Sequence, residues 1–146
     1  MRVPHNTMVL VTDGRKRLFF RNEGEADAPH LVVVGAAENA NPNTRDQVTD
    51  SAGRASSPVS AGGSLPSADA HDVEEERFVA ETAEELRRGA LAGDYSDLIL
   101  VASPKTLGQL RKKIHAEVEK RTRREIDKDV TGHPVAEIEK MLMAFD

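Results

Sequence analysis

The chain has 146 residues, a formal net charge of −5 and an aromatic content of 3%. An acidic chain with so few aromatic side chains argues against a protein that coats nucleic acid along its whole surface or stacks bases of single strands. It contains no cysteine, which excludes disulfides, thiolate metal sites and cysteine nucleophiles.

The length fits one domain, residues 1–146. No apolar run approaches the roughly 20 residues that span a bilayer, and the first residues do not lead into a signal-peptide core. We therefore expect a cytoplasmic protein that has no membrane partner.

The first predicted elements form an antiparallel meander. The apolar run Met8–Val11 predicts a buried strand, and Asp13-Gly14 before Lys16–Phe20 is a strong hairpin signal, because type I′ turns need positive φ. Leu31–Val34 predicts the third strand. We interpret Asp13 as a turn former, since nothing in the sequence gives its carboxylate a partner.

Residues 38–71 show no periodic pattern and are rich in Asn, Ser, Gly, Pro and Ala. A segment this long without a pattern predicts a flexible loop between the third strand and the first main helix. This segment contains two Gly-rich stretches. Neither of them matches the motif of a phosphate-binding loop, and a plain flexible linker explains the composition of the segment. The glycines and their polar neighbours remain candidates for a loop site: Gly53, Arg54, Gly62, Gly63 and Ser64.

An acidic helix is predicted to begin at Asp72, with a capping box formed by Asp72 and Glu75, and to end at Gly93. Its acids suit a solvated helix face, and a protein partner that docks there is the alternative. No histidine is placed to complete a metal site with these carboxylates, so we expect no metal.

A buried strand, Asp97–Ala102, precedes Ser103-Pro104, which suits a helix N-cap followed by proline at the first helical position. The next helix carries one apolar stripe, formed by Leu107, Leu110, Ile114 and Val118.

A further strand is predicted from Arg123 to Val130, and a last helix after Thr131, with Ile138 and Leu142 facing the core. The element order predicts an α/β domain with a mixed sheet of about five strands and about three flanking helices.

No Ser/His/Asp arrangement, nucleophile elbow or helical zinc motif is present, so we predict no catalytic residue and no cofactor. The basic cluster between Lys105 and Lys128 is the one feature that suggests a partner. It suits either a soluble basic face that balances the acidic helix or contact with the phosphates of structured RNA. The RNA-binding candidates are Lys105, Arg111, Lys112, Lys113, Arg121, Arg123 and Arg124.

Several stretches, in order along the chain, resemble the bacterial family known as "protein required for attachment to host cells". The Pro-Lys-x-Leu-Gly-x-Leu-Arg stretch is the most specific of them, and Ser103 stands where a second proline or another small residue is expected. The matching segments are Val9–Phe19, Asp50 with Gly53-Arg54, Phe78–Leu86, Leu98–Ala102, Pro104–Arg111 and Lys128–Thr131.

That family is similar to the middle domain of archaeal and eukaryotic release factors and of Pelota. The resemblance implies a mixed-sheet domain whose long loop, in true release factors, carries the Gly-Gly-Gln motif for peptidyl-tRNA hydrolysis. Here Ser64 follows Gly62-Gly63 in place of glutamine. We therefore expect a non-enzymatic domain that contacts the ribosome or structured RNA and affects attachment indirectly. The alternatives are a hydrolase of peptidyl-tRNA or another ester and a protein-interaction module that uses the acidic helix.

Overall fold

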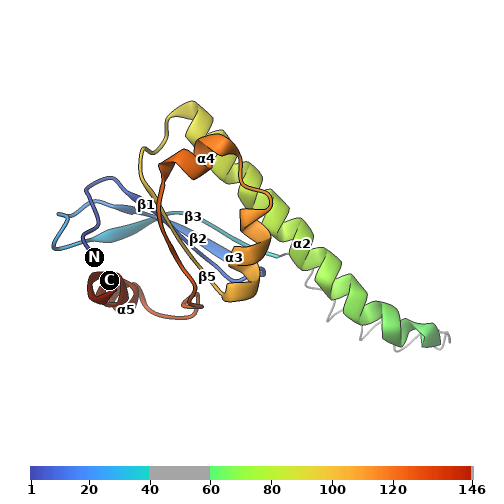
Figure 1. Ribbon diagram of the computed structural model, residues 1–146. Coiled ribbons are helices and arrows are strands. Elements are labelled where there is room, and N and C mark those ends of the chain that lie inside the picture. Colours follow the sequence, from blue (N-terminus) through green and yellow to red (C-terminus); the bar gives the residue numbers. More distant parts are fainter. Residues whose placement is uncertain (40–59, 146) are drawn as a thin grey trace.

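A five-stranded mixed sheet forms the centre of the protein, seen here in a computed structural model (Figure 1). The structure describes residues 1–39 and 60–145, and for residues 60–71 only the backbone. The strands are β1 (Met8–Thr12), β2 (Lys16–Asn22), β3 (Leu31–Glu38), β5 (Leu98–Ala102) and β6 (Thr122–Ile126). The helices are α2 (Ser60–Ala92), α3 (Pro104–Arg111), α4 (Ala116–Arg121) and α5 (Val135–Ala144).

The strand order is β3-β2-β1-β5-β6. The hairpin partners β1 and β2 pair antiparallel, as do β2 and β3, whereas β5 runs parallel to both β1 and β6. Every residue of β1 and β5 is buried, which explains why these two strands read as continuous apolar runs and lie in the middle of the sheet.

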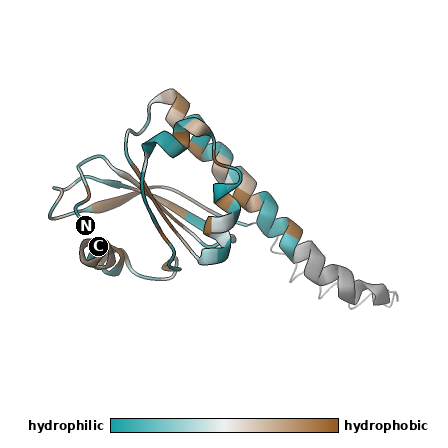
Figure 2. Cartoon of the chain, viewed as in Figure 1, coloured by the Kyte–Doolittle hydropathy of each residue, from teal (hydrophilic) through white to brown (hydrophobic). Residues whose placement is uncertain are grey.

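Helices cover both faces of the sheet and create two apolar layers (Figures 1 and 2). On one face α2, α3 and α4 pack on alternate residues of the central strands, and on the other face α5 packs on the residues between them. The first layer includes Leu10, Leu86, Leu100, Leu110 and Val118, and the second includes Val9, Phe20, Ile99, Ile126 and Leu142.

The predicted fold class is confirmed: the protein is a single α/β domain with a mixed five-stranded sheet. The long segment predicted between the third strand and the first main helix is also present. Its residues 40–59 lie outside the described part of the chain. The backbone of residues 60–71 belongs to α2, although the sequence analysis placed these residues in the loop, so the expected helix start at Asp72 is wrong.

The single helix predicted after β5 is two helices. The backbone turns after Arg111, and the imidazole Nδ1 of His115 accepts a hydrogen bond from Glu117 N, which caps a new helix. The apolar stripe hid this break, because Leu110 and Val118, on either side of it, face the same core layer as Ile114 within it. The strand expected to reach Val130 ends at Ile126.

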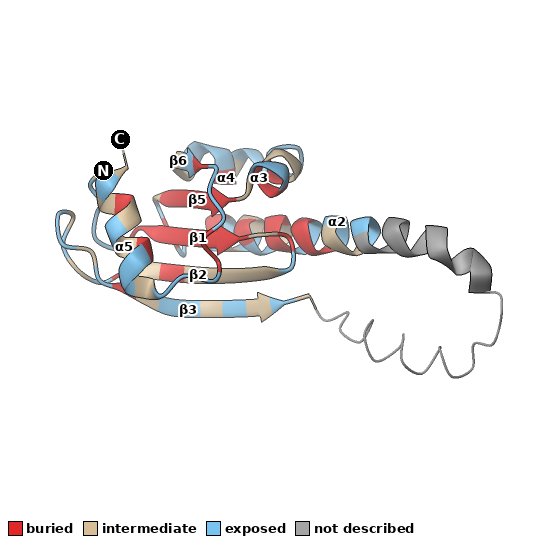
Figure 3. Cartoon of the chain, turned by 90° about the horizontal axis from the view of Figure 1, so that it is seen from below, coloured by how far each residue is buried: buried red, intermediate tan, exposed pale blue. Residues whose placement is uncertain are grey.

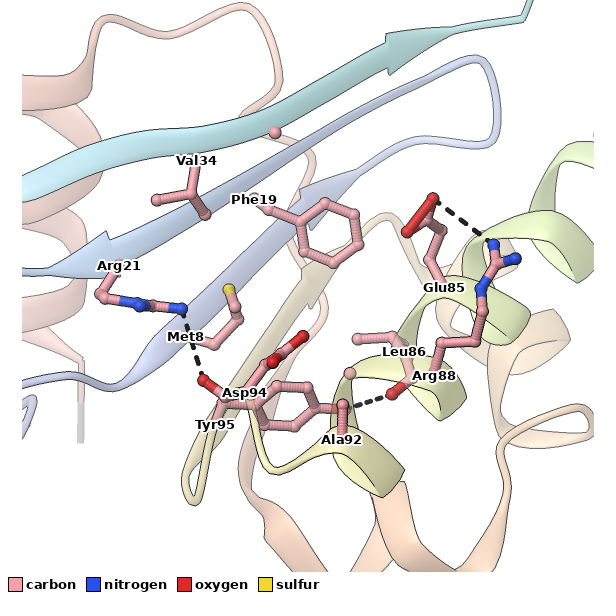
Figure 4. A pocket seen from close by; sticks show the side chains of 12 residues that line it. Met8, Phe19, Arg21, Val34, Glu85, Leu86, Arg88, Ala92, Asp94 and Tyr95 are labelled. Carbon is pink, nitrogen blue, oxygen red and sulfur yellow. Dashed lines mark hydrogen bonds and ion pairs between the residues drawn. The ribbon is translucent and has the colours of Figure 1, made fainter.

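Tyr95 closes the end of the first apolar layer, where α2 meets β5. Its hydroxyl donates to the carbonyl of Leu86 over 2.7 Å (Figure 4). Gly89 makes room for the ring, because a Cβ at this position would lie 2.9 Å from Tyr95 Cε1. Burial raises the pKa of the Tyr95 phenol to about 12, against the lowering effect of Arg121.

We predict that the phenol of Tyr95 titrates near its raised pKa in the folded protein and near about 10 in the unfolded chain. The chain has one tyrosine and no tryptophan, so phenolate absorbance reports on this residue alone. Since the folded pKa is the higher one, the stabilisation is complete below pH ~10 and is lost as the pH rises toward the folded value.

The measurement is an absorbance titration of native and urea-unfolded protein, with circular dichroism recorded at each pH. Tyr95→Phe is the control; it should abolish the absorbance change and cost about 1 kcal/mol at neutral pH. A native midpoint equal to that of the unfolded chain would contradict a buried phenol.

Candidate functional site

The carboxyl ends of β1, β5 and β6 meet at one edge of the sheet, because these three strands are parallel. Ligands of open α/β sheets bind outside such strand ends. Three segments that carry the family resemblance follow these ends directly: Thr12–Arg15, Pro104–Thr106 and Lys128–Thr131. We call the polar residues that meet there the strand-end cluster: Asp13, Arg15, Glu75, Lys105, Asp129 and Thr131.

Asp13 is the centre of this cluster. Its Oδ1 accepts from the backbone N–H groups of Arg15 and Lys16, both at 2.9 Å, which builds the β1–β2 turn. The hydroxyl of Thr131 lies 3.0 Å from Asp13 Oδ2 and 3.0 Å from Asp129 Oδ1. One hydroxyl proton thus faces two carboxylates and can be donated to only one of them at a time.

Glu75 brings α2 into the cluster. Its carboxylate binds Arg15 at 3.1 Å and Lys105 at 3.5 Å, and Lys105 also lies 3.7 Å from Asp72. Gly14 permits this approach: its φ is +92°, and a Cβ would lie 3.3 Å from Thr106 Oγ1. Arg15 and Lys105 thus neutralise Glu75, whereas Asp13 and Asp129 share the Thr131 hydroxyl and form no ion pair within the described chain.

The β1–β2 turn of this cluster contacts both the end of β3 and the middle of α2. At the end of β3, Asn39 N donates to Arg15 O over 2.6 Å, and its side-chain amide donates to Glu74 O over 3.4 Å. On α2, Glu75 binds Arg15 and Lys105. The β1–β2 turn thereby sets where the chain leaves the sheet and where α2 returns to it.

In the sequence, Asp13 had no recognisable partner, and the structure supplies one that is 118 residues away. The short-range signal at Lys128–Thr131 came only from the family resemblance. The side-chain bonds of Asp13 support a turn and a loop crossing, which is the chemistry of a positioning residue. Among residues 1–39 and 72–145, no group of three or more His, Asp or Glu could hold a metal ion.

The predicted RNA-binding residues do not form one surface. The outer side of α3, α4 and β6 carries Arg111, Lys112, Lys113, Arg121 and Arg123, and we call it the basic face. Lys105 belongs to the strand-end cluster. Arg124 lies on the opposite face of β6, with its guanidinium 5.3 Å from the ring centroid of Phe145.

Most cations of the basic face bind carboxylates. Arg111 pairs with Glu125 at 2.7 Å, Arg123 pairs with Asp97, and Arg121 pairs with Glu117 at 2.8 Å. The hydrogen bond from Arg121, followed by that from Lys120, lowers the pKa of the Glu117 carboxyl. Arg121 also donates to the carbonyl of Tyr95, which ties α4 to the start of β5. These arginines hold the layer together.

Lys112 and Lys113 differ from their neighbours. Both are exposed at the corner between α3 and α4, and within the described chain neither forms an ion pair. They supply the unneutralised charge of the basic face.

The structure describes only part of the candidate loop site in the long segment. Gly53 and Arg54 lie outside the described residues. Gly62, Gly63 and Ser64 lie within the helical backbone of α2, and their side chains and surroundings are likewise outside the described part.

The acidic face of α2 is partly neutralised along the helix itself. Glu74 pairs with Arg77, and the pairs formed by Glu84 and Glu85 each use an arginine one turn later, Arg87 and Arg88. The hydrogen bond from Arg87 lowers the pKa of the Glu84 carboxyl. A helix face of paired charges is typical of a solvated surface.

Thr131→Val removes the hydroxyl that joins the 128–131 crossing to the β1–β2 turn. We expect it to lower the free energy of unfolding by about 1–2 kcal/mol, because a carboxylate oxygen loses its donor. Urea unfolding measures this loss.

Double-mutant cycles decide which of the two carboxylates accepts the hydrogen bond from the Thr131 hydroxyl. Thr131→Val combined with Asp13→Asn should show coupling of about 1 kcal/mol, and the cycle with the exposed Asp129→Asn should show less. Equal additivity in both cycles would contradict the Asp13–Thr131 link.

None of the described helices has the length and apolar character needed to cross a membrane. A search of the curated proteins found no match to the sequence. The family model for "bacterial archaeo-eukaryotic release factor family 12" matches residues 6–142. That range contains every strand of the sheet and the whole strand-end cluster, and it agrees with the release-factor resemblance of the separate segments. The chain therefore belongs to bacterial archaeo-eukaryotic release factor family 12.

Proposed function

We propose that this chain is a non-enzymatic, cytoplasmic release-factor-like domain that contacts RNA through the corner between α3 and α4. The partner is the ribosome or another structured RNA. The role in attachment to host cells, which the family resemblance implies, is then indirect and runs through the expression or assembly of surface components.

The observation that carries this proposal is the pair Lys112-Lys113. The arginines around it bind carboxylates, so they are held in place and contribute little net charge. The two lysines are exposed and without an ion-pair partner in the described chain, so their ammonium groups are available to phosphates.

The surroundings of the lysines favour structured RNA over a single strand. No Phe, Tyr or Trp occurs between Tyr95 and Phe145 in the sequence, and the His115 imidazole at the corner caps α4, so the corner offers no large aromatic ring on which an unpaired base could stack. Lysines on a rigid helix end suit the regularly spaced phosphates of a folded RNA, which proteins recognise by shape.

The non-enzymatic part of the proposal rests on the residues. By resemblance, Ser64 occupies the position where the catalytic glutamine of release factors is expected. Asp13, a carboxylate of the strand-end cluster, already accepts from two backbone amides and faces the Thr131 hydroxyl. Both features support a positioning role for the strand-end cluster rather than bond cleavage.

Co-sedimentation with ribosomes of the source bacterium tests the proposal over a series of salt concentrations. We expect binding that weakens as salt rises. Lys112→Glu combined with Lys113→Glu should reduce the slope of log affinity against log salt by about 2, because two phosphate contacts are lost.

The matched control is Arg2→Glu combined with Lys140→Glu, which changes the net charge equally at exposed positions away from the basic face. It should retain most of the binding. Equal loss in both double variants would show a nonspecific charge effect, and absence of binding at low salt would reject RNA contact.

A further inference from the structure

In the described part of the chain, the outer side of β3 is an unpaired strand edge. It is the outermost strand in the sheet order, and no strand of the described chain pairs with its outer side (Figure 3). Its residues 31–37 include no charge and no proline, the features with which natural proteins usually guard such edges. Val33 and Val34 are each 48% exposed.

The hydrogen bonds of β2 show which backbone groups of β3 point outward in its first half. Asn22 exchanges backbone bonds with Asn6 and Thr7, so it faces away from β3, and its neighbour Glu23 donates to His30 O. Because backbone direction alternates along a strand, Leu31 and Val33 turn their polar groups to the outer edge. The hydrogen bond of Leu31 N supports this assignment, since it goes to Glu139 Oε2 and not to β2.

A bulge shifts this alternation in the second half. Phe20 is opposite Val33 and Phe19 is opposite Gly35, which leaves Val34 without a partner residue on β2. Beyond the bulge, Asn39 N donates to Arg15 O, so counting back from Asn39 places the outward groups at Ala36 and Glu38. The outward-facing residues are therefore Leu31, Val33, Ala36 and Glu38.

We propose that β3 pairs antiparallel with β3 of a second copy of this chain, about a twofold axis between Val34 and Gly35. This register sets Val33 opposite Ala36 and Leu31 opposite Glu38, so the outward-facing residues pair with one another. It is an isologous contact, which joins the two sheets into one and is independent of RNA binding.

The side chains in this register fit one another. Each valine meets a small residue: Val32 is opposite Ala37, Val33 opposite Ala36, and Val34 opposite Gly35. The paired residues also lie on the same face, since Val33 and Ala36 are opposite Phe20 and Leu18, which both belong to the α5 layer. Val34 adjoins a groove of about 420 Å³ between β2, β3 and α2, where a partner strand would cover Phe19 (Figure 4).

The charges also favour a second copy. The protein has a net charge of −5, yet its edge residues 31–37 are uncharged, so two copies meet there without repulsion. Like charges approach only at the ends, where Glu38 of one copy lies opposite Leu31 of the other, whose N–H is bound to Glu139. Glu139 therefore weakens the pairing.

The test is sedimentation equilibrium of the full chain over a concentration series, with amide hydrogen exchange measured by NMR. We expect a dimer that dissociates on dilution. The amides of Val33 and Ala36 should become protected as the dimer forms, whereas the amide of Val32, which faces β2, should be protected at every concentration.

Three variants make the test specific. Val33→Lys should weaken the dimer about tenfold or more, equal to about 1.4 kcal/mol. Leu91→Lys, a matched change at a side chain 55% exposed on α2, should leave the dissociation constant unchanged. Glu139→Ala should tighten the dimer, because it frees Leu31 N and removes a like charge.

The proposal is overturned by a protein that stays monomeric at all concentrations. It is also overturned by a dimer whose Val33 and Ala36 amides exchange freely, or by equal effects of Val33→Lys and Leu91→Lys.

Discussion

Burial of β1 and β5 on both faces is the constraint on which the rest of the structure depends. These two parallel strands are buried at every position and apolar at all but Thr12, so each face must be covered, with α2, α3 and α4 on one side and α5 on the other. Because the two strands are parallel, their carboxyl ends lie together. The strand-end cluster is a direct consequence of that geometry.

The polar chemistry of the molecule is arranged around this core in two ways. At the strand ends, Asp13, Glu75 and Lys105 join the β1–β2 turn to α2 and α3 through side chains that satisfy one another. On the basic face, arginines bind nearby carboxylates and leave Lys112 and Lys113 as exposed charges. The chain is acidic overall, but its surface has distinct regions: charges are paired at Glu75 and exposed at Lys112 and Lys113.

The two edges of the sheet also differ. The edge strand β6 carries three consecutive charged residues, Arg123, Arg124 and Glu125, and its arginines bind a carboxylate, an aromatic ring and the adjoining loop. The other edge strand, β3, is uncharged over residues 31–37 and carries a bulge at Val34. A domain built around one buried parallel pair thus has a basic corner between α3 and α4 and, at the far side of the sheet, an uncharged strand edge at residues 31–37.

The sequence by itself determined the elements and the fold class. Apolar runs at Met8–Val11 and Leu98–Ala102, the Asp13-Gly14 turn signal and the Ser103-Pro104 helix start are local patterns, and short-range sterics and hydrogen bonding decide them. The release-factor resemblance likewise came from short segments. Where a local pattern is ambiguous, the prediction failed: the stripe from Leu107 to Val118 continues across a break that the spacing conceals.

Only the tertiary structure decided which distant residues meet. Thr131 reaches Asp13 across 118 positions because the crossing after β6 returns over the end of β1. Glu75 was expected to cap a helix start and instead binds Arg15 and Lys105, since α2 begins earlier and passes the strand ends. The physical reason is that strand order and helix placement follow from burying one shared core, and no window of neighbouring residues contains that information.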